Sequence, residues 1–346
     1  MLAVLVALLP VTAFLLVLFL LDSFKLVPRW MLGRALASGA AAALTGLVLH
    51  AWLFRLTGLD TRTFGRLVAP FTEETLKAVC LLYPLRRGQL GFLVDAAIVG
   101  FAVGGGFALV ENVEYLRGLA QPRIGVWIVR GFGTAIMHAS ATAIVAMAAK
   151  ALVDRYPARG LMVLLPGWAV AVALHATFNR ALVSPLLAAA VLLLVVPLVV
   201  LAVFERSERL TREWVGDGMD LDVELLALMR SSHFGATRLG RYLTELKARF
   251  PGPVVADMFC LLQLELELGI RAKGMLMARE AGFEVPIDDQ IRASLAERAY
   301  LQRAIGPTGV LALRPLQVTS RRDEWHRYLL RHAGTSRRAG GAGPSG

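Results

Sequence analysis

Residues 67–85, LVAPFTEETLKAVCLLYPL, decide the fold that this sequence predicts. The stretch is close to the roughly 20 residues that a helix needs to cross about 30 Å of hydrocarbon. Two adjacent carboxylates, Glu73 and Glu74, interrupt its apolar run. An ionisable side chain inside a span costs about 3 kcal/mol on insertion scales and marks a candidate functional site. The stretch therefore predicts a transmembrane helix that carries chemistry.

Similar hydrophobic segments fill the chain on both sides of this stretch, up to residue 204. Seven spans are expected, at 2–22, 36–54, 67–84, 92–116, 124–149, 160–180 and 185–204. From Glu205 onward the chain reads as water-soluble, and its amphipathic runs predict further helices. We therefore expect an all-α fold: a polytopic transmembrane helical bundle (1–205), a C-terminal helical soluble domain (206–334) and a disordered tail (335–346).

The positive charge of the chain belongs mainly to its membrane part. Residues 1–204 hold 16 Lys and Arg against 8 Asp and Glu, and the remainder holds 21 against 18, which gives the net charge of +11. This distribution favours anionic lipid headgroups, and not nucleic acid, as the partner of the basic residues. With the N-terminus outside, eleven Lys and Arg fall in cytoplasmic segments and six in external ones. The positive-inside rule then places the C-terminal domain in the cytoplasm.

Later spans add four more polar residues, Glu111, His138, His175 and Asn179. Because successive spans run in opposite directions, these residues and the two glutamates all fall in the same half of the bilayer. His175 and Asn179 are four positions apart, so they share one face of a helix. A carboxylate and imidazole site within the bilayer is therefore expected, and its inventory resembles that of an enzyme.

Spacing also makes predictions for the residues around these six. Lys77 is four positions after Glu73 and is expected to neutralise part of the acid pair, whereas Glu74 points about 100° away. The two glutamates are therefore expected to have different roles. The run Gly100, Gly104, Gly105 and Gly106 predicts close approach of neighbouring helices to the span that carries Glu111. His50 is expected to serve only in packing.

Several of these elements together resemble a known family of intramembrane proteases. FTEETLK (71–77) looks like the EExxK signature of PrsW-type proteases, and FALVE (107–111) resembles their FxxxE element. His138 and the stretch HATFN (175–179) complete the set in the same order. The resemblance covers residues 65–185 and extends to the superfamily of the CAAX prenyl endopeptidases and Abi proteins. Residues 205–346 show no such resemblance.

The resemblance implies an intramembrane peptidase in the bacterial inner (cytoplasmic) membrane. Its substrate would be a membrane-anchored protein, such as a regulator resembling an anti-sigma factor. Hydrolysis needs a base for water, a donor for the oxyanion and an acid for the leaving amine. Glu73 or Glu74 is expected to hold the water, with help from His175. Asn179 is expected to hydrogen-bond the oxyanion, and His138 and Glu111 to complete the pocket.

Three alternatives remain open from the sequence. No cofactor is expected under a glutamate mechanism, but Glu111, His138 and His175 would also make a sufficient ligand set for a catalytic zinc. A proton-coupled transporter would use the same ionisable groups as a relay, since such residues also mark ion pathways. A non-catalytic membrane receptor that signals through the C-terminal domain is the third.

Overall fold

The computed structural model describes residues 2–22, 26–118, 124–283, 288–313, 315–316 and 330. All regular secondary structure in these residues is helical, which confirms the predicted fold class. The chain forms two compact units, Met1–Glu208 and Arg209–Gly346. The tail expected to be disordered, residues 335–346, lies outside the described residues.

Six helical stretches of the described chain are long and apolar enough to cross a membrane. They are α1 (Leu2–Leu21), α2 (Arg29–Thr57), α5 (Leu93–Gly118), Ile124–Arg155, Gly160–Arg180 and α9 (Pro185–Arg230). The predicted third span forms α4 (Ala69–Arg86), but Glu73, Glu74 and Lys77 lower its hydropathy below that of a self-sufficient span. The bundle shelters these three side chains, because all three are buried.

Short irregular segments divide several of these stretches. Ile124–Arg155 consists of α6 (Ile124–Ile128), a π-helical segment η2 (Val129–Thr134) and α7 (Ala135–Arg155). The 3-10 helix η3 (Pro157–Leu164) precedes α8 (Leu165–Arg180). Before α4 lie α3 (Thr61–Thr63) and a second π-helical segment, η1 (Phe64–Val68). Asp60 caps α3, since its carboxylate accepts from the backbone N–H groups of Arg62 and Thr63.

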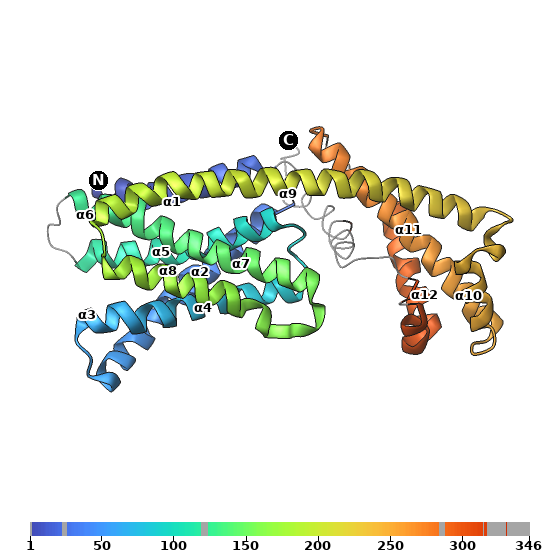
Figure 1. The fold of residues 1–346 in the computed structure, drawn as a ribbon, viewed down its shortest axis with the longest axis horizontal. Helices are drawn as coiled ribbons and strands as arrows, with labels where there is room; N and C mark the ends of the chain where they lie inside the picture. The colour runs from blue at the N-terminus through green and yellow to red at the C-terminus, as the bar shows by residue number, and fades with distance from the viewer. Residues whose placement is uncertain are drawn as a thin grey trace, which may run out of the picture. The chain divides into compact units, whose positions relative to one another are not determined.

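Helix α5 forms the centre of the first unit, packed between α2 and α7 (Figure 1). Glycines make this packing possible. A Cβ atom at Gly104 would lie 2.4 Å from the backbone oxygen of His138 in α7, and one at Gly106 would lie 2.1 Å from that of Leu36 in α2. The predicted close approach around the glycine run is therefore present, and it places Glu111 beside α7.

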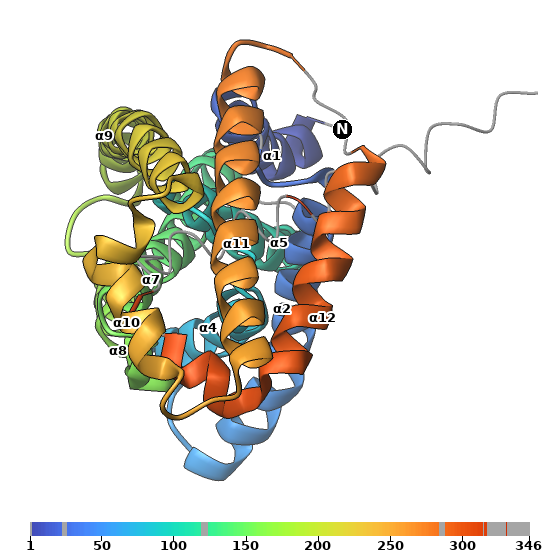
Figure 2. The same ribbon diagram turned by 90° about the vertical axis from the view of Figure 1, so that its right-hand side faces the viewer.

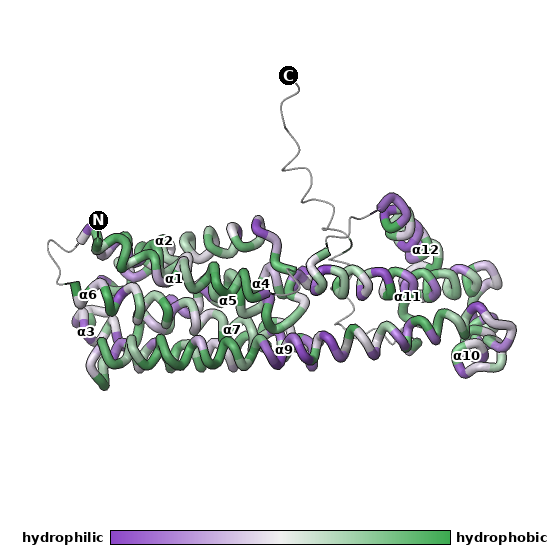
Figure 3. Tube along the Cα trace, turned by 90° about the horizontal axis from the view of Figure 1, so that it is seen from above, coloured by the Kyte–Doolittle hydropathy of each residue, from purple (hydrophilic) through white to green (hydrophobic). Residues whose placement is uncertain are grey.

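The helices of the first unit are coloured mainly hydrophobic in Figure 3, as helices in contact with lipid require. Large hydrophobic side chains of α1, α2 and the first part of α9 are exposed, among them Leu9, Val48 and Leu194. Along α9 the colouring in Figure 3 changes from hydrophobic to hydrophilic. This change follows the sequence, in which charged residues begin at Glu205.

The second unit is a set of packed helices (Figure 2). After α9 come η4 (Phe234–Ala236), α10 (Arg238–Leu246), α11 (Gly252–Glu280) and α12 (Asp289–Leu313). α11 and α12 lie side by side and bury apolar residues such as Met258 and Leu276 between helices. Two buried cations are paired: Lys273 with Asp222 at 2.8 Å and Arg298 with Glu265 at 3.0 Å. The predicted helical character of this region is confirmed.

Candidate active site

Five of the six predicted site residues line a single cavity of about 580 Å³ in the first unit. The five are Glu73, Glu111, His138, His175 and Asn179. They come from four helices, α4, α5, α7 and α8, which the sequence separates by up to about one hundred positions. The sixth, Glu74, does not line the cavity but is fully buried directly behind it. The structure therefore brings all six together.

Glu74 holds two neighbours in place through one oxygen. Its Oε1 accepts from Lys77 Nζ at 2.6 Å and from His175 Nδ1 at 2.8 Å. Because Nδ1 of His175 donates to a carboxylate, the ring keeps its lone pair on Nε2. Glu74 thus fixes the tautomer and the orientation of His175. Lys77 pairs with Glu74 three positions earlier, which corrects the expectation that it would pair with Glu73.

Lys77 also fixes the tautomer of His138. Its Nζ lies 2.9 Å from His138 Nδ1, and an ammonium group can only donate, so Nδ1 accepts and Nε2 carries the ring proton. Nε2 lies 3.0 Å from Glu111 Oε2. Both ring nitrogens of His138 are therefore engaged, one with a cation and one with a carboxylate.

Arg130 completes the far side of this network. Its Nη2 lies 3.1 Å from Glu111 Oε1, and its Nε donates to Asn112 Oδ1 at 2.9 Å. Asn112 Nδ2 in turn donates to the backbone oxygen of Ala7. The π-helical segment η2 carries Arg130, and such segments occur frequently at functional sites. The sequence signal for this pair is that Arg130 lies in one predicted span and Glu111 lies in the span before it.

Glu73 differs from Glu74 because it faces the cavity and lacks a close partner. Its Oε2 is buried, has no hydrogen-bond partner among the described residues, and lies 3.9 Å from His175 Nε2. Its Oε1 lies 4.0 Å from His50 Nδ1. His50 also contacts Thr72 Oγ1 at 2.6 Å through Nε2. The expectation that His50 only packs is therefore incomplete, because this histidine lines the cavity beside Glu73.

Asn179 lies at the edge of the cavity and is anchored by one of its amide hydrogens. Its Nδ2 donates to the backbone oxygen of Gly65 at 2.9 Å, in the π-helical segment η1. An amide NH₂ has two hydrogens, so one remains for a ligand in the cavity. Asn179 and His175 share a face of α8, as their spacing predicts.

A metal ion would find a suitable donor set in this cavity. One ligand atom each of Glu73, His138 and His175 lies within 4.8 Å of the others. Two imidazoles and a carboxylate are a known ligand set for catalytic zinc, and Glu73 Oε2 lacks a hydrogen-bond partner in the described structure. The carboxylate behind His175 is also typical of zinc sites. The sequence predicts Glu111, His138 and His175 as metal ligands, whereas the structure groups Glu73, and not Glu111, with the two histidines.

The profile of a family described as PrsW family intramembrane metalloprotease matches residues 27–204, about half of the chain. The match contains every residue of the cavity named above. No curated protein and no solved structure gives a significant match to the chain.

Proposed function

This chain belongs to the PrsW family of intramembrane metalloproteases, and we propose that Glu73 and His175 activate the water that hydrolyses its substrate. As an intramembrane peptidase of this family, it is an integral membrane protein that acts on another membrane protein. The residues that do the chemistry are our proposal. We also propose that cleavage takes place near the external surface, that the protein lies in the bacterial inner membrane, and that the C-terminal domain is cytoplasmic.

The observation that carries the proposal is the pair of Glu73 Oε2 and His175 Nε2, 3.9 Å apart. A carboxylate oxygen and a lone-pair nitrogen are both acceptors, so they cannot hydrogen-bond each other. A water molecule between them can donate one hydrogen to each atom, at the usual distance of about 2.8 Å. Its lone pair then points away from both bases and is free to attack a carbonyl carbon.

The reaction follows from these positions. Glu73 accepts a proton from water as the oxygen adds to the carbonyl carbon of the scissile bond, and the carbonyl oxygen takes the negative charge. The second N–H of Asn179 donates to that oxygen. When the tetrahedral intermediate collapses, the C–N bond breaks and Glu73 returns its proton to the leaving amine. His175 stays oriented throughout by Glu74.

The family description implies a metal, and the residues present fit one. Glu73, His138 and His175 would hold it, and when bound it would acidify water and polarise the carbonyl. Two features favour the glutamate mechanism instead. Lys77 places an ammonium 2.9 Å from His138 Nδ1, where it would repel a cation, and His138 Nε2 already faces Glu111. The placement in the wider CAAX and Abi superfamily stays a prediction.

The test is a comparison of cleavage products. The full chain is expressed with a library of tagged single-span membrane proteins, and fragments are identified by mass spectrometry for wild type and for the Glu73→Gln, Glu74→Gln double variant. New termini that appear only with wild type support the proposal. Identical fragment patterns, with both proteins folded and inserted, would contradict it and favour the transporter or the receptor.

A further inference from the structure

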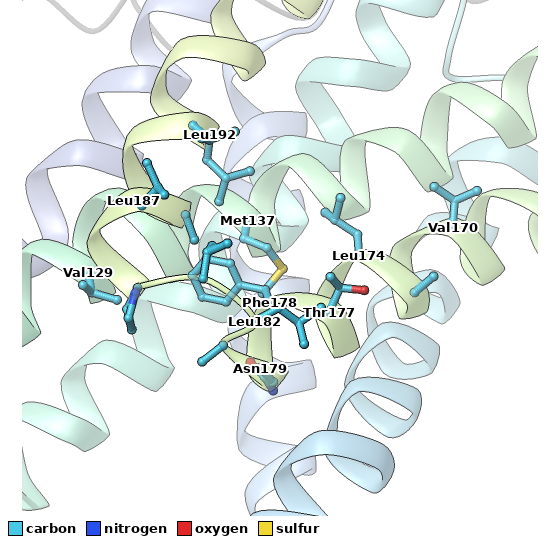
Figure 4. Close-up of a pocket in the computed structure, with 16 residues that line it drawn as sticks. Val129, Met137, Val170, Leu174, Thr177, Phe178, Asn179, Leu182, Leu187 and Leu192 are labelled. Carbon is cyan, nitrogen blue, oxygen red and sulfur yellow. The ribbon is translucent and has the colours of Figure 1, made fainter.

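A second cavity, of about 850 Å³, lies in the first unit (Figure 4). α8, the first turns of α9 and the residues that connect these two helices form most of its walls, and Val129 of η2 and Met137 of α7 complete them. Figure 4 shows Leu174, Phe178, Leu182, Leu187 and Leu192 turned toward it. Its lining is almost entirely apolar, and Thr177 and Asn179 are the polar exceptions. We refer to this cavity as the α8–α9 groove.

The groove adjoins the candidate active site at two points. Asn179 lines both cavities. Met137 lines the groove, and the next residue, His138, lines the active-site cavity. A molecule in the groove would therefore reach the proposed oxyanion donor without leaving the bundle.

We propose that the α8–α9 groove binds the transmembrane helix of the protein substrate. The inference rests on the proposed function and identifies where the substrate docks. The walls belong to membrane-spanning helices, so the occupant is apolar. A peptidase must also receive a peptide bond at Asn179, which a substrate helix beside the site supplies and a lipid acyl chain does not.

The lining is suited to contact between helices. Ala173 of α8 and Ala188 of α9 offer small side chains, which allow another helix to approach closely in a membrane. Thr177 lines the groove and is exposed, and its hydroxyl has no hydrogen-bond partner among the described residues. Serine and threonine hydroxyls commonly bond across helix pairs in membranes. A substrate helix that ends near Thr177 would present a peptide bond of its unwound backbone to Glu73.

Photo-crosslinking tests which molecule occupies the groove. A photoreactive amino acid replaces Leu187, which lines the groove, or its neighbour Leu186, which does not; the two are 53% and 54% exposed. Both variants carry Glu73→Gln and are expressed as full chains with the tagged single-span library. The proposal predicts tagged adducts from position 187 at about ten times the yield from position 186. Equal yields from the two positions, or adducts with lipid alone from 187, would overturn it.

A matched pair of substitutions tests the consequence for cleavage. Ala173 lines the groove and Ala190 does not, although both alanines are exposed on spans. Ala173→Trp fills the groove and should lower kcat/KM for a single-span substrate about tenfold, mainly through KM. It should leave cleavage of a short peptide with the same scissile bond unchanged. Ala190→Trp should change neither.

The outcomes separate the two proposals. If wild type cleaves neither substrate, the proposed function fails, whatever the crosslinks show. If wild type cleaves both substrates, and the Ala173→Trp variant cleaves the single-span substrate at the wild-type rate, the groove proposal alone fails. Equal losses on both substrates would also overturn it, because they would show damage to the active site and not to docking.

Discussion

At the scale of single residues, the two adjacent glutamates occupy different environments. Glu74 is enclosed and bonded through Oε1 to Lys77 and His175, whereas Glu73 faces the cavity and its Oε2 lies 3.9 Å from His175 Nε2. Adjacency on a helix explains the difference, since neighbours point about 100° apart. We therefore propose a positioning role for Glu74 and a reactive role for Glu73.

Glu74→Gln should inactivate the protein and destabilise it. The change leaves the Lys77 ammonium buried without its carboxylate, which costs about 3–5 kcal/mol. Thermal unfolding in detergent should show this loss. Adding Lys77→Met removes the second charge and should restore the melting temperature. Cleavage should not return, because a neutral amide replaces the carboxylate beside His175 and the ammonium that fixes His138 is lost. A double variant that cleaves like wild type would contradict the positioning role of Glu74.

Metal removal separates the two mechanisms that this residue set supports. We expect cleavage to persist after dialysis against a strong zinc chelator, because Lys77 and Glu111 engage both nitrogens of His138. The measurement is the initial rate before and after chelation, with metal content determined in parallel. A rate that falls with the metal content and returns on addition of Zn²⁺ would establish the metal mechanism instead.

At the scale of elements, the close contact between α5 and α7 positions Glu111 against His138. Gly104 allows this contact, whereas the adjacent Gly105 faces a softer neighbour. A Cβ at Gly104 would meet backbone at 2.4 Å, and one at Gly105 would meet only the Val11 side chain at 3.3 Å. The two positions therefore make a matched comparison.

Gly104→Ala should push α7 away from α5 and weaken both the fold and the site. The overpacking is expected to cost about 1–3 kcal/mol and to reduce cleavage. Gly105→Ala should remain close to wild type in both respects, because a side chain can move where a backbone cannot. Thermal melting and cleavage rates of the two variants check this. Equal effects would show that helix contact at Gly104 does not position the site.

The elements also show what sequence can and cannot predict. Hydropathy predicts most spans, and alternation of span direction predicts that Glu73, Glu111 and His175 lie at one depth. Contacts between helices are a different matter. The pairing of Arg130 with Glu111 depends on the packing of η2 against α5, and the position of His50 depends on α2 packing against α4. Neither contact has a signature within its own helix.

At the scale of the whole molecule, the chain divides into a membrane unit and a helical unit that begins at Arg209. The active-site cavity and the α8–α9 groove both lie within the first unit. Which side of the membrane holds the second unit follows only from the charge bias of the loops. The two cysteines allow this to be tested, since Cys260 of the second unit is exposed.

Labelling of Cys260 should report the orientation. In a Cys80→Ala background, a membrane-impermeant thiol reagent should label Cys260 only after the cells are opened, as the positive-inside rule predicts. Cys80 is replaced because it is the other thiol of the chain. A cysteine introduced at Gly58, in the loop between α2 and α3, should be labelled in intact cells and serves as the external control. Labelling of Cys260 in intact cells would reverse the proposed topology.

The most direct measurement compares two glutamates of the same cavity. Glu73 and Glu114 both line it, but Glu114 pairs with Arg117 near the surface. Both are changed to Gln, and kcat/KM is measured on a membrane-protein substrate in liposomes. We expect a loss of about 10²- to 10⁴-fold for Glu73→Gln, the range typical of a general base, and little change for Glu114→Gln. Wild-type activity in a folded Glu73→Gln variant would contradict it.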